Sequence, residues 1–409
     1  MAAYQSPDFL HLDDNHYSDE ERMVRDSVRD WVSREFLPKL TEHVRQDGSF
    51  PMELVSQIAE LGMFGANLKG YGCAGMNNVS YGLLMQELER GDSGLRSFAS
   101  VQGSLCMYPI HKYGSEEQKE EWLPGMAAGE KIGCFGLTEP DFGSFVTGMA
   151  TRAERKGDGW VLNGTKTWIS NGGIADVHVV IAVVDPEFGS RGHASFVVPP
   201  NTPGFSQGQK FSKHGIRASH TAEVVLDDVR IPGSCLLGGK EKLDERLARV
   251  REGKPGNAQA AMQTFEATRP AVGAQAVGVA RAAFEYARDY AKERVQFGKP
   301  IVQHQAIAFM LADMATEIDA ARLLVWRAAW LAKQGGFVNA EGSMAKLKAG
   351  RVAVWATERA MQVLGGAGYV TDHPVERWHR DSKIYDIFEG TEQIQQLVIS
   401  RAVSGMRIE

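Results

Sequence analysis

The sequence is poor in cysteine. It has four in 409 residues, at Cys73, Cys106, Cys134 and Cys235, and no two of them form a CxxC pair. Cysteines spaced this widely argue against a disulfide framework and against a structural zinc site. We therefore expect a protein of a reducing compartment that binds no metal.

Positive charge and long apolar runs are also missing. The formal net charge is -6, which gives no electrostatic support for nucleic-acid binding. No apolar run approaches the ~18 residues of a membrane span, so we expect no membrane insertion. Residues 1–21 are acidic and lack the features of a signal or transit peptide. We expect a cytoplasmic protein, or a mitochondrial-matrix protein from which a transit peptide has been removed.

Several catalytic motifs are absent. The sequence has no Walker A pattern, no HExxH and no GxSxG. The glycines of Gln362–Tyr369 follow no predicted strand, so they indicate a glycine-rich helix end rather than a dinucleotide fingerprint. What remains is an ordinary globular composition, 43% hydrophobic and 23% charged, in a chain long enough for two or three domains.

The chain divides into three parts. Residues 1–130 predict a helical domain, which begins with a capping box at Ser18–Glu21. Residues 131–240 predict a small β-domain, and the β-branched run at 177–184 suits a buried strand. Residues 241–409 are alanine-rich and helical, typical of a bundle. The predicted fold is mainly α with a middle β-domain.

Three local features add detail. Lys156–Gly159 predicts a turn, and the Asn163-Gly164 pair between β-forming residues predicts a hairpin. Residues 240–263 predict an exposed excursion that contains a short helix bearing Leu243, Leu247 and Val250.

Glu389 is the strongest candidate for chemistry. It follows Tyr385, Ile387 and Phe388 and precedes a helix that Thr391 can cap. Burial raises the pKa of a carboxylate, whereas a helix N-terminus lowers it, and this competition can tune a general base. The alternative is a surface glutamate in a loop. The helix from 392 to 403 is expected to turn four apolar residues inward, namely Ile394, Leu397, Val398 and Val403.

Two further stretches offer ligand-binding groups. Thr138 and Ser144 bring hydroxyls to a glycine-rich segment between the first two domains, and Trp168 and Ser170 add an aromatic plane and another hydroxyl. An interdomain turn and a core tryptophan are the alternatives. Arg294, on a basic turn between two helices, could pair with a phosphate or simply cap a helix end.

In order along the chain, these segments resemble the acyl-CoA dehydrogenase family over essentially its whole length. The segments are Leu137–Pro140 with Gly143–Ser144, Trp168–Gly172, Arg294–Pro300, Gln362–Gly366 and Phe388–Thr391. The resemblance implies an N-terminal helical domain, a middle β-barrel-like domain, a C-terminal four-helix bundle, FAD as cofactor and a homotetramer. It also implies an acyl-CoA substrate and an electron-transferring flavoprotein or similar acceptor.

The resemblance also implies roles for single residues. Those beside the flavin ring would be Phe135, Leu137, Thr138, Trp168 and Ser170. A neighbouring subunit would bring Arg294, Phe297, Gln305, Gln362 and Gly366 to the adenosine pyrophosphate, and Thr391 and Gln393 would complete the site. Ser144 would lie near both cofactor and CoA, and Arg269 near the CoA. Glu389 would remove the α-proton of the thioester while the β-hydrogen leaves as hydride to the flavin.

The N-terminal half is similar to the glutaryl-CoA dehydrogenase branch, through Lys69–Gly75 and Glu87–Ser97. In that branch an arginine matching Arg96 binds the distal carboxylate of the substrate. Its expected neighbours are Glu89, Ser97 and Ser100. The alternative for Arg96 is a structural ion pair with Glu89 or Asp92.

The C-terminal half looks more like medium- and short-chain acyl-CoA dehydrogenases, through Thr268–Pro270 and His304–Met310. Phe388 stands where the glutaryl branch usually has tyrosine, and Phe145 where aspartate is common.

We expect FAD-dependent α,β-dehydrogenation of an acyl-CoA thioester. The substrate would be glutaryl-CoA or a similar dicarboxylyl-CoA, whose product can lose CO2 to give crotonyl-CoA. A short- or medium-chain enzyme acting on an uncharged acyl chain is the alternative. The presence of Glu389 argues against a binding scaffold that has lost activity.

Overall fold

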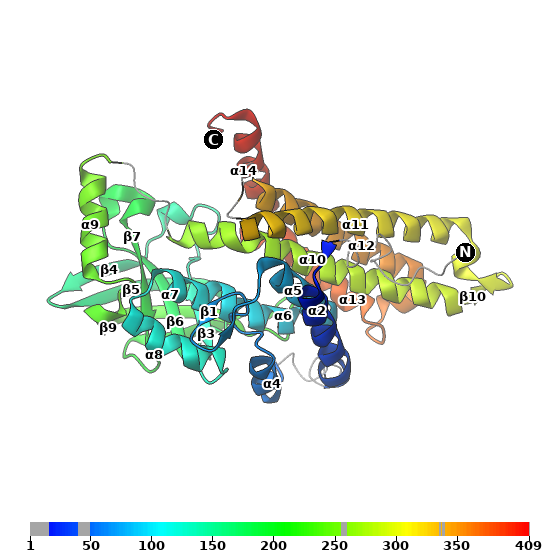
Figure 1. Ribbon diagram of the computed structural model, residues 1–409, viewed down its shortest axis with the longest axis horizontal. Coiled ribbons are helices and arrows are strands. Elements are labelled where there is room, and N and C mark those ends of the chain that lie inside the picture. Colours follow the sequence, from blue (N-terminus) through cyan, green and yellow to red (C-terminus); the bar gives the residue numbers. More distant parts are fainter. Residues whose placement is uncertain (1–15, 40–49, 255–259, 335–336, 338–339, 409) are drawn as a thin grey trace.

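A β-sheet domain lies between two helical regions of the chain. The computed structural model describes residues 16–39, 50–254, 260–334, 337 and 340–408. In Figure 1 the sheet occupies one end of the elongated molecule, the C-terminal helices reach the other end, and the N-terminal helices lie along their junction. This is the mainly α fold with a middle β-domain that the sequence predicts.

The N-terminal region is built from short helices. They are α2 (Asp19–Trp31), η2 (Val32–Phe36), η3 (Met52–Leu54), α4 (Val55–Glu60), α5 (Asn78–Gly91), α6 (Ser93–Ser100), η4 (Val101–Met107), α7 (Tyr108–Tyr113) and α8 (Glu116–Ala127), with a small hairpin of β1 (Lys69–Gly70) and β2 (Cys73–Ala74). The predicted capping box is present: Ser18 Oγ accepts from the Glu21 amide at 3.2 Å, and Glu21 Oε2 accepts from the Ser18 amide at 2.9 Å. It satisfies amide groups that the helix start leaves unpaired.

The middle region is a seven-stranded sheet. Its strands are β3 (Gly133–Gly136), β4 (Arg152–Lys156), β5 (Gly159–Ser170), β6 (Val177–Val183), β7 (His193–Val198), β8 (Phe205–Lys210) and β9 (Thr221–Pro232), with short helical turns η5 (Val146–Gly148), η6 (Pro186–Gly192) and η7 (Gly233–Cys235). The order is β3-β6-β4-β5-β9-β8, and β7 also pairs with β6. Every residue of β6 is buried, as its β-branched run predicts.

The hairpin predicted at Asn163-Gly164 is wrong. Both residues lie inside β5, where the register against β9 shifts between Leu162 and Gly164. Gly164 is needed because a Cβ there would come within 2.5 Å of Thr151 Oγ1, and the Asn163 side chain accepts from the Asp228 amide at 2.8 Å. The pair therefore makes a bulge within a strand. The hairpin turn lies between Lys156 and Gly159, the other predicted turn.

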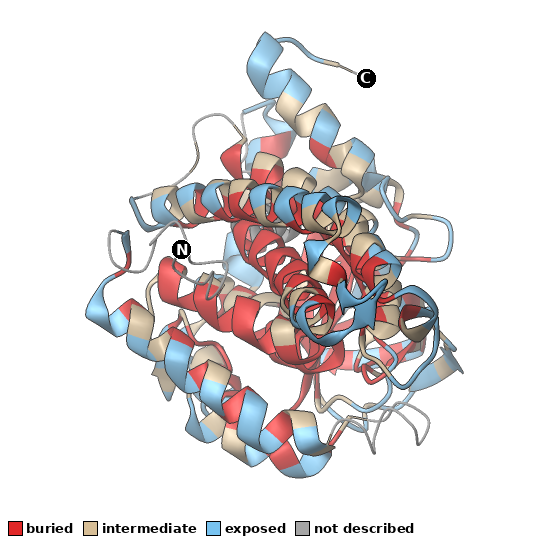
Figure 2. Ribbon diagram, turned by 90° about the vertical axis from the view of Figure 1, so that its right-hand side faces the viewer, coloured by how far each residue is buried: buried red, intermediate tan, exposed pale blue. Residues whose placement is uncertain are grey.

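The C-terminal region is dominated by long helices. They are α10 (Ala260–Glu293), α11 (Gln305–Gln334), α12 (Glu341–Leu364), α13 (Val375–Ser382) and α14 (Glu392–Ser404), with η8 (Ile301–Gln303), η9 (Gly365–Tyr369) and η10 (Lys383–Asp386); the hairpin β10 (Val295–Gln296) and β11 (Lys299–Pro300) joins α10 to α11. Alanines such as Ala283, Ala321 and Ala353 are fully buried. Their small side chains let the long helices pack closely, and Figure 2 shows buried residues gathered where the helices face one another.

The predicted exposed excursion is attached to the sheet domain. It begins with α9 (Lys240–Arg251), which carries the predicted apolar stripe. Leu243 and Leu247 are buried in one cluster with Trp160 and Phe196 of the sheet. The segment is therefore not wholly exposed, because one face of α9 needs an apolar partner. Residues 255–259 lie outside the described residues.

No helix in the described part of the chain is both long enough and apolar enough to cross a membrane.

A buried charge cluster joins the two helical regions. The Glu87 carboxylate on α5 is fully buried and pairs with Arg29 of α2 at 3.3 Å, with Arg90 at 2.9 Å and with Arg281 of α10. Burial alone would raise the pKa of Glu87, but the three arginines hold it well below its usual range. The carboxylate is therefore charged whenever the protein is folded near neutral pH.

Glu87→Gln should lower the free energy of unfolding by about 3–5 kcal/mol, because Arg281, Arg29 and Arg90 would lose the buried carboxylate that they share. Chemical denaturation measures this loss. The control is Glu285→Gln, which removes the other partner of Arg281, at 2.9 Å and with the Glu285 side chain 24% exposed. That change should cost less than about 1 kcal/mol. If the two variants lose equal free energy of unfolding, Glu87 does not stabilise the contact between the two helical regions.

Candidate active site

Glu389 sits on a tight turn between η10 and α14. Its φ is +52°, unusual for a residue with a side chain, and Gly390 follows at +90°. Thr391 ends the turn, since its hydroxyl accepts from the Ile394 amide at 3.3 Å as the helix cap that the sequence predicts. The backbone is held in a strained conformation at the residue proposed for catalysis.

The Glu389 carboxylate lies among polar and cationic groups of other helices. Thr268 of α10 donates its hydroxyl hydrogen to Oε2 at 2.7 Å. Burial raises the pKa of Glu389, and the Thr268 hydrogen bond together with Lys346, Arg96 and Arg269 opposes this rise without cancelling it. A carboxylate with a raised pKa is a stronger base once ionised, which suits proton abstraction.

Arg96 lies deep in the structure beside this turn. It is 2% exposed, and its Nε donates to Glu89 Oε2 at 2.6 Å. Its Nη2 donates to the Tyr385 hydroxyl at 3.2 Å, and its Nη1 lies 3.4 Å from Ser100 Oγ. The guanidinium carbon lies 5.6 Å from the ring centre of Phe388, the residue before Glu389. Arg96 therefore contacts the side chain of Phe388, which directly precedes the candidate base in the chain.

The structure brings most of the predicted substrate-binding residues together. Glu89 and Ser100 both contact Arg96, and Ser97 is the next residue along α6, where its hydroxyl accepts from Ser219 Oγ at 3.4 Å. Asp92 does not contact the guanidinium. It caps α6 instead, accepting from the Gly94 and Leu95 amides at 2.7 and 3.1 Å. Of the two predicted ion-pair partners, only Glu89 is used.

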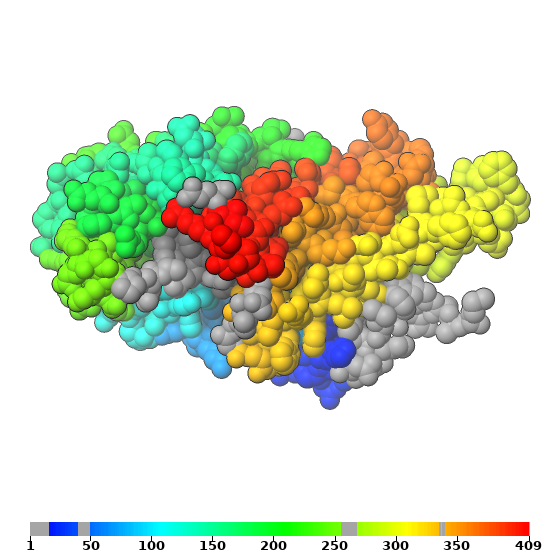
Figure 3. Space-filling view, turned by 90° about the horizontal axis from the view of Figure 1, so that it is seen from above, coloured from blue at the N-terminus to red at the C-terminus, as the bar shows by residue number. Residues whose placement is uncertain are grey.

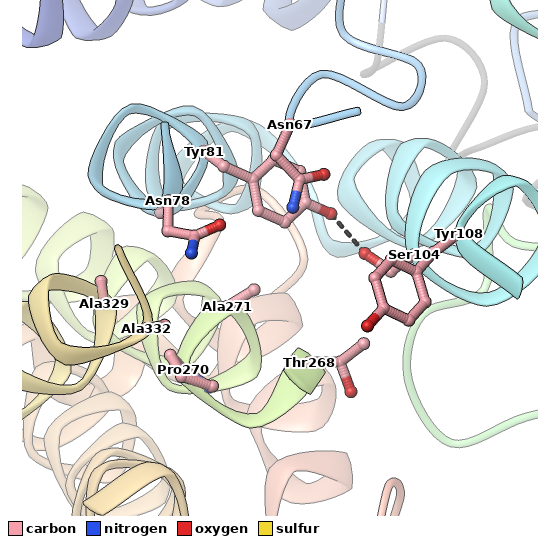
Figure 4. A pocket seen from close by; sticks show the side chains of 11 residues that line it. Asn67, Asn78, Tyr81, Ser104, Tyr108, Thr268, Pro270, Ala271, Ala329 and Ala332 are labelled. Carbon is pink, nitrogen blue, oxygen red and sulfur yellow. Dashed lines mark hydrogen bonds between the residues drawn. The ribbon is translucent and has the colours of Figure 1, made fainter. Parts of the chain in front are cut away.

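A pocket opens beside Thr268. Its lining includes Tyr81 of α5, Ser104 of η4, Tyr108 of α7 and Thr268 itself, with small residues of α10 and α11 around them. Figure 4 shows the Tyr81 hydroxyl pointing to Ser104, and the two oxygens lie 2.5 Å apart. Burial raises the pKa of Tyr81 to about 12, so the phenol stays neutral. Thr268 therefore connects an accessible pocket to the Glu389 carboxylate.

The two segments predicted to meet the flavin ring lie side by side. The Thr167 amide donates to the Thr138 carbonyl at 2.8 Å, which joins the segment after β3 to the end of β5. Trp168 has a φ of +59° and is 61% exposed, and the ring of Phe211 is tilted against it with the ring centres 4.2 Å apart. An exposed indole beside hydroxyl and amide groups fits a planar heteroaromatic ring. Phe135 and Leu137 are buried, Thr138 and Ser170 half-buried, and Ser144 exposed.

A buried ion pair fixes this segment from behind. Lys166 is fully buried and donates to the Leu137 carbonyl at 3.1 Å and to Glu139 Oε1 at 2.8 Å. Glu139 in turn accepts from the Thr151 amide at 2.9 Å. The backbone that would meet the cofactor is therefore supported by a charged pair that the sequence does not mark.

A second group of predicted cofactor residues lies far from Trp168. Arg294 and Phe297 belong to the hairpin at the far end of the molecule from the sheet (Figure 1), and Phe297 is 93% exposed. Gln305, Gln362 and Gly366 are exposed as well. One chain does not bring this group to the flavin segment. Thr391 and Gln393 lie instead beside Glu389, and Arg269 is buried next to Thr268.

Helix α14, which follows Glu389, stands at the molecular surface. Figure 3 shows the C-terminal segment lying over that face in red. Gln395 is its buried residue, while Ile394, Leu397 and Val398 are half-buried and Val403 is 73% exposed. The prediction that Val403 packs inward is wrong for a single chain.

Some contacts of the site carried no clear sequence signal. Thr268 and Tyr385 contact Glu389 and Arg96 across more than a hundred residues of chain. Lys346 could have been noticed, because it shares the buried face of α12 with Ala345, Ala349 and Ala353. A lysine at such a position must have a special partner.

Comparison with known proteins agrees with this architecture. Family profiles for the N-terminal, middle and C-terminal domains of acyl-CoA dehydrogenases match residues 18–130, 134–229 and 258–404. The mitochondrial short-chain specific acyl-CoA dehydrogenase of Bos taurus is 41% identical over 401 residues, covering 98% of this chain and 92% of the relative.

Solved structures give the same result. The crystal structure of glutaryl-CoA dehydrogenase from Mycobacterium smegmatis is 42% identical, with a TM-score of 0.90 over 99% of both chains. A glutaryl-CoA dehydrogenase from the same organism in complex with FADH2 is 38% identical, with a TM-score of 0.90 over 98% of this chain and 99% of that one. The resemblance seen in the sequence is confirmed. The chain belongs to the acyl-CoA dehydrogenase family, whose members are oxidoreductases that use FAD to dehydrogenate acyl-CoA thioesters.

Proposed function

We propose that this acyl-CoA dehydrogenase acts on a short acyl chain with a carboxylate at its far end, glutaryl-CoA or a similar dicarboxylyl-CoA. The buried Arg96 carries this proposal. A short dicarboxylate cannot keep its distal charge in water while its α-carbon lies beside Glu389, so the pocket must supply a cation. Three of the solved structures similar to this chain are glutaryl-CoA dehydrogenases.

The hydrogen bonding of Arg96 leaves room for such a ligand. Arginine has about five N–H donors, and the ion pair with Glu89 engages Nε alone. Among the described residues, the hydrogen-bond partner of Nη1 is Ser100 Oγ, at the long distance of 3.4 Å. A carboxylate could take its remaining hydrogens, and charge-assisted bonds of this kind are strong. Glu89 and Tyr385 would hold the guanidinium in place for it.

The chain's own groups support proton abstraction at the other end of the substrate. Thr268 engages Glu389 Oε2, which leaves Oε1 to accept the α-proton. FAD, when bound, supplies the acceptor for the hydride that leaves the β-carbon. Arg96 at one end and the segment from Leu137 to Thr138 at the other would fix the acyl chain between them.

A plain short-chain acyl-CoA dehydrogenase is the second candidate. The Arg96 and Glu89 pair has no net charge, so an uncharged acyl chain could also occupy the pocket. The 41% identity to the bovine short-chain enzyme favours this candidate. A flavin-bleaching screen of the holoenzyme with glutaryl-CoA, butyryl-CoA and octanoyl-CoA decides between the two.

Glu389→Gln should abolish flavin reduction by the preferred acyl-CoA while FAD stays bound, because the amide cannot accept the α-proton. A loss of more than about two orders of magnitude is expected for general-base catalysis. Stopped-flow bleaching and the flavin absorbance of the purified variant measure the two properties. A variant that bleaches at nearly the wild-type rate would place the base elsewhere.

Arg96→Leu should reduce kcat/KM for glutaryl-CoA by about a hundredfold or more, equivalent to about 3 kcal/mol, and leave butyryl-CoA turnover nearly unchanged. Because this change leaves Glu89 buried and unpaired, Arg96→Leu/Glu89→Leu is the matched variant that preserves neutrality. If both substrates lose activity in equal proportion, Arg96 is structural and the short-chain candidate leads.

We further propose that FAD binds between copies of the chain in a homotetramer, and that an electron-transferring flavoprotein or similar acceptor reoxidises it. The exposed hairpin bearing Arg294 and Phe297 supports this arrangement, because it lies far from Trp168 in the same chain. A second copy would have to bring the hairpin to the cofactor.

Arg294→Ala should weaken FAD retention by about tenfold to a hundredfold, the effect of removing a charge-assisted bond to a phosphate. Flavin content after extensive dialysis measures it. Lys299→Ala, on the same exposed hairpin, removes a cation whose hydrogen-bond partner in the described part of the chain is the Gln303 carbonyl, at 3.2 Å, and should retain the flavin. Full occupancy in both variants would count against the hairpin as a cofactor contact.

A further inference from the structure

Lys346 is a buried cation placed directly behind the Glu389 turn. It lies on α12, is 2% exposed, and its ammonium group donates to the Gly390 carbonyl at 2.6 Å. Among the described residues no carboxylate lies within 4 Å of it. Burying an ammonium group without a direct counter-ion is costly, so its position requires an explanation.

The turn has a second, uncharged support. Gln395 of α14 is fully buried, and its Nε2 donates to the Gly390 carbonyl at 2.9 Å and to the Glu389 carbonyl at 3.3 Å. The positive φ of Glu389 costs of order 1 kcal/mol or more and persists only where surrounding contacts hold it. Lys346 and Gln395 are those contacts, one charged and one neutral.

Charged groups from several helices surround Glu389 and Lys346, and they determine how the charge of Lys346 affects the Glu389 carboxylate. Glu389 is faced by Lys346 from α12, Arg96 from α6 and Arg269 from α10, with the neutral hydroxyls of Thr268 and Tyr81 beside them. Lys346 is in turn influenced by Glu389, Asp386 and Glu392, which favour its charge, and by Arg269, which opposes it. Burial lowers the pKa of Lys346 to about 8, so it remains charged at neutral pH.

We propose that Lys346 is a positioning residue for the base: it holds the Glu389 turn through the Gly390 carbonyl, and its charge keeps the half-buried Glu389 carboxylate ionised. This inference depends on the proposed role of Glu389 as the base. It does not depend on which acyl-CoA is the substrate. Hydrogen bonding alone could come from Gln395, whereas only a cation stabilises the charged form of Glu389.

The test is the pH dependence of kcat/KM in Lys346→Met, measured on the holoenzyme with the best substrate of the bleaching screen. The base must be ionised to act, so a higher pKa moves the acid limb of the profile to higher pH. We expect the midpoint to rise by about one pH unit, at the low end of the effect of an opposite charge. Lys346→Arg should restore the midpoint even where the rate is lower.

Gln395→Leu is the matched control, because it removes the neutral support and leaves the charge. It should reduce kcat without moving the acid limb. If Lys346→Met also slows the enzyme without moving the limb, or if Gln395→Leu moves it equally, the charge has no role and the proposal is overturned. If Lys346→Met does not fold, Lys346→Gln carries the same comparison. Failure of the base assignment shows separately, as bleaching by Glu389→Gln.

Discussion

The structure depends on carboxylates that are buried and must stay charged. Glu87, Glu89 and Glu139 each lie out of water with an arginine or lysine beside them. A buried charge is tolerated only when it is paired and hydrogen-bonded. The first pair joins the two helical regions, the second lies beside Tyr385 and Phe388 before the Glu389 turn, and the third supports the backbone at Leu137. Glu389 differs, because its nearest donor is the neutral Thr268 and its cations stand further off. Unlike those three, the carboxylate proposed to take up a proton has no close ion pair among the described residues.

Local chemistry made much of the fold predictable. The capping box at Ser18–Glu21 and the buried strand at β6 depend on neighbouring residues, and both are present. The Asn163-Gly164 pair shows the limit of such reasoning. Its residues favour a turn, but pairing with β9 and the approach of Thr151 convert it into a bulge. Tertiary contacts determine the backbone conformation at this position, and the local sequence does not predict them.

In the candidate site, too, some residues could be predicted from the sequence and some contacts could not. Glu389 could be singled out from the residues that follow and precede it, and Arg96 through its resemblance to a known branch. Thr268, Lys346 and Tyr385 act through contacts between helices distant in sequence. The residues near them in the sequence do not predict those contacts. The exposed hairpin of Arg294 and Phe297 is a stronger case, since its proposed partner lies on another copy of the chain.

Phe388 has a consequence for how this enzyme can change over evolutionary time. Its ring lies against the Arg96 guanidinium, and the next residue in the chain is Glu389. A substitution of Phe388 changes the contact with Arg96 and, at the same time, the residue bonded to the one that carries the carboxylate. With the roles proposed for Arg96 and Glu389, acyl-chain preference and reaction rate are coupled at this position. A lineage that altered its substrate here would need compensating changes in the turn, whereas one that altered Ser100 or Tyr385 could shift preference while leaving the residue next to Glu389 unchanged.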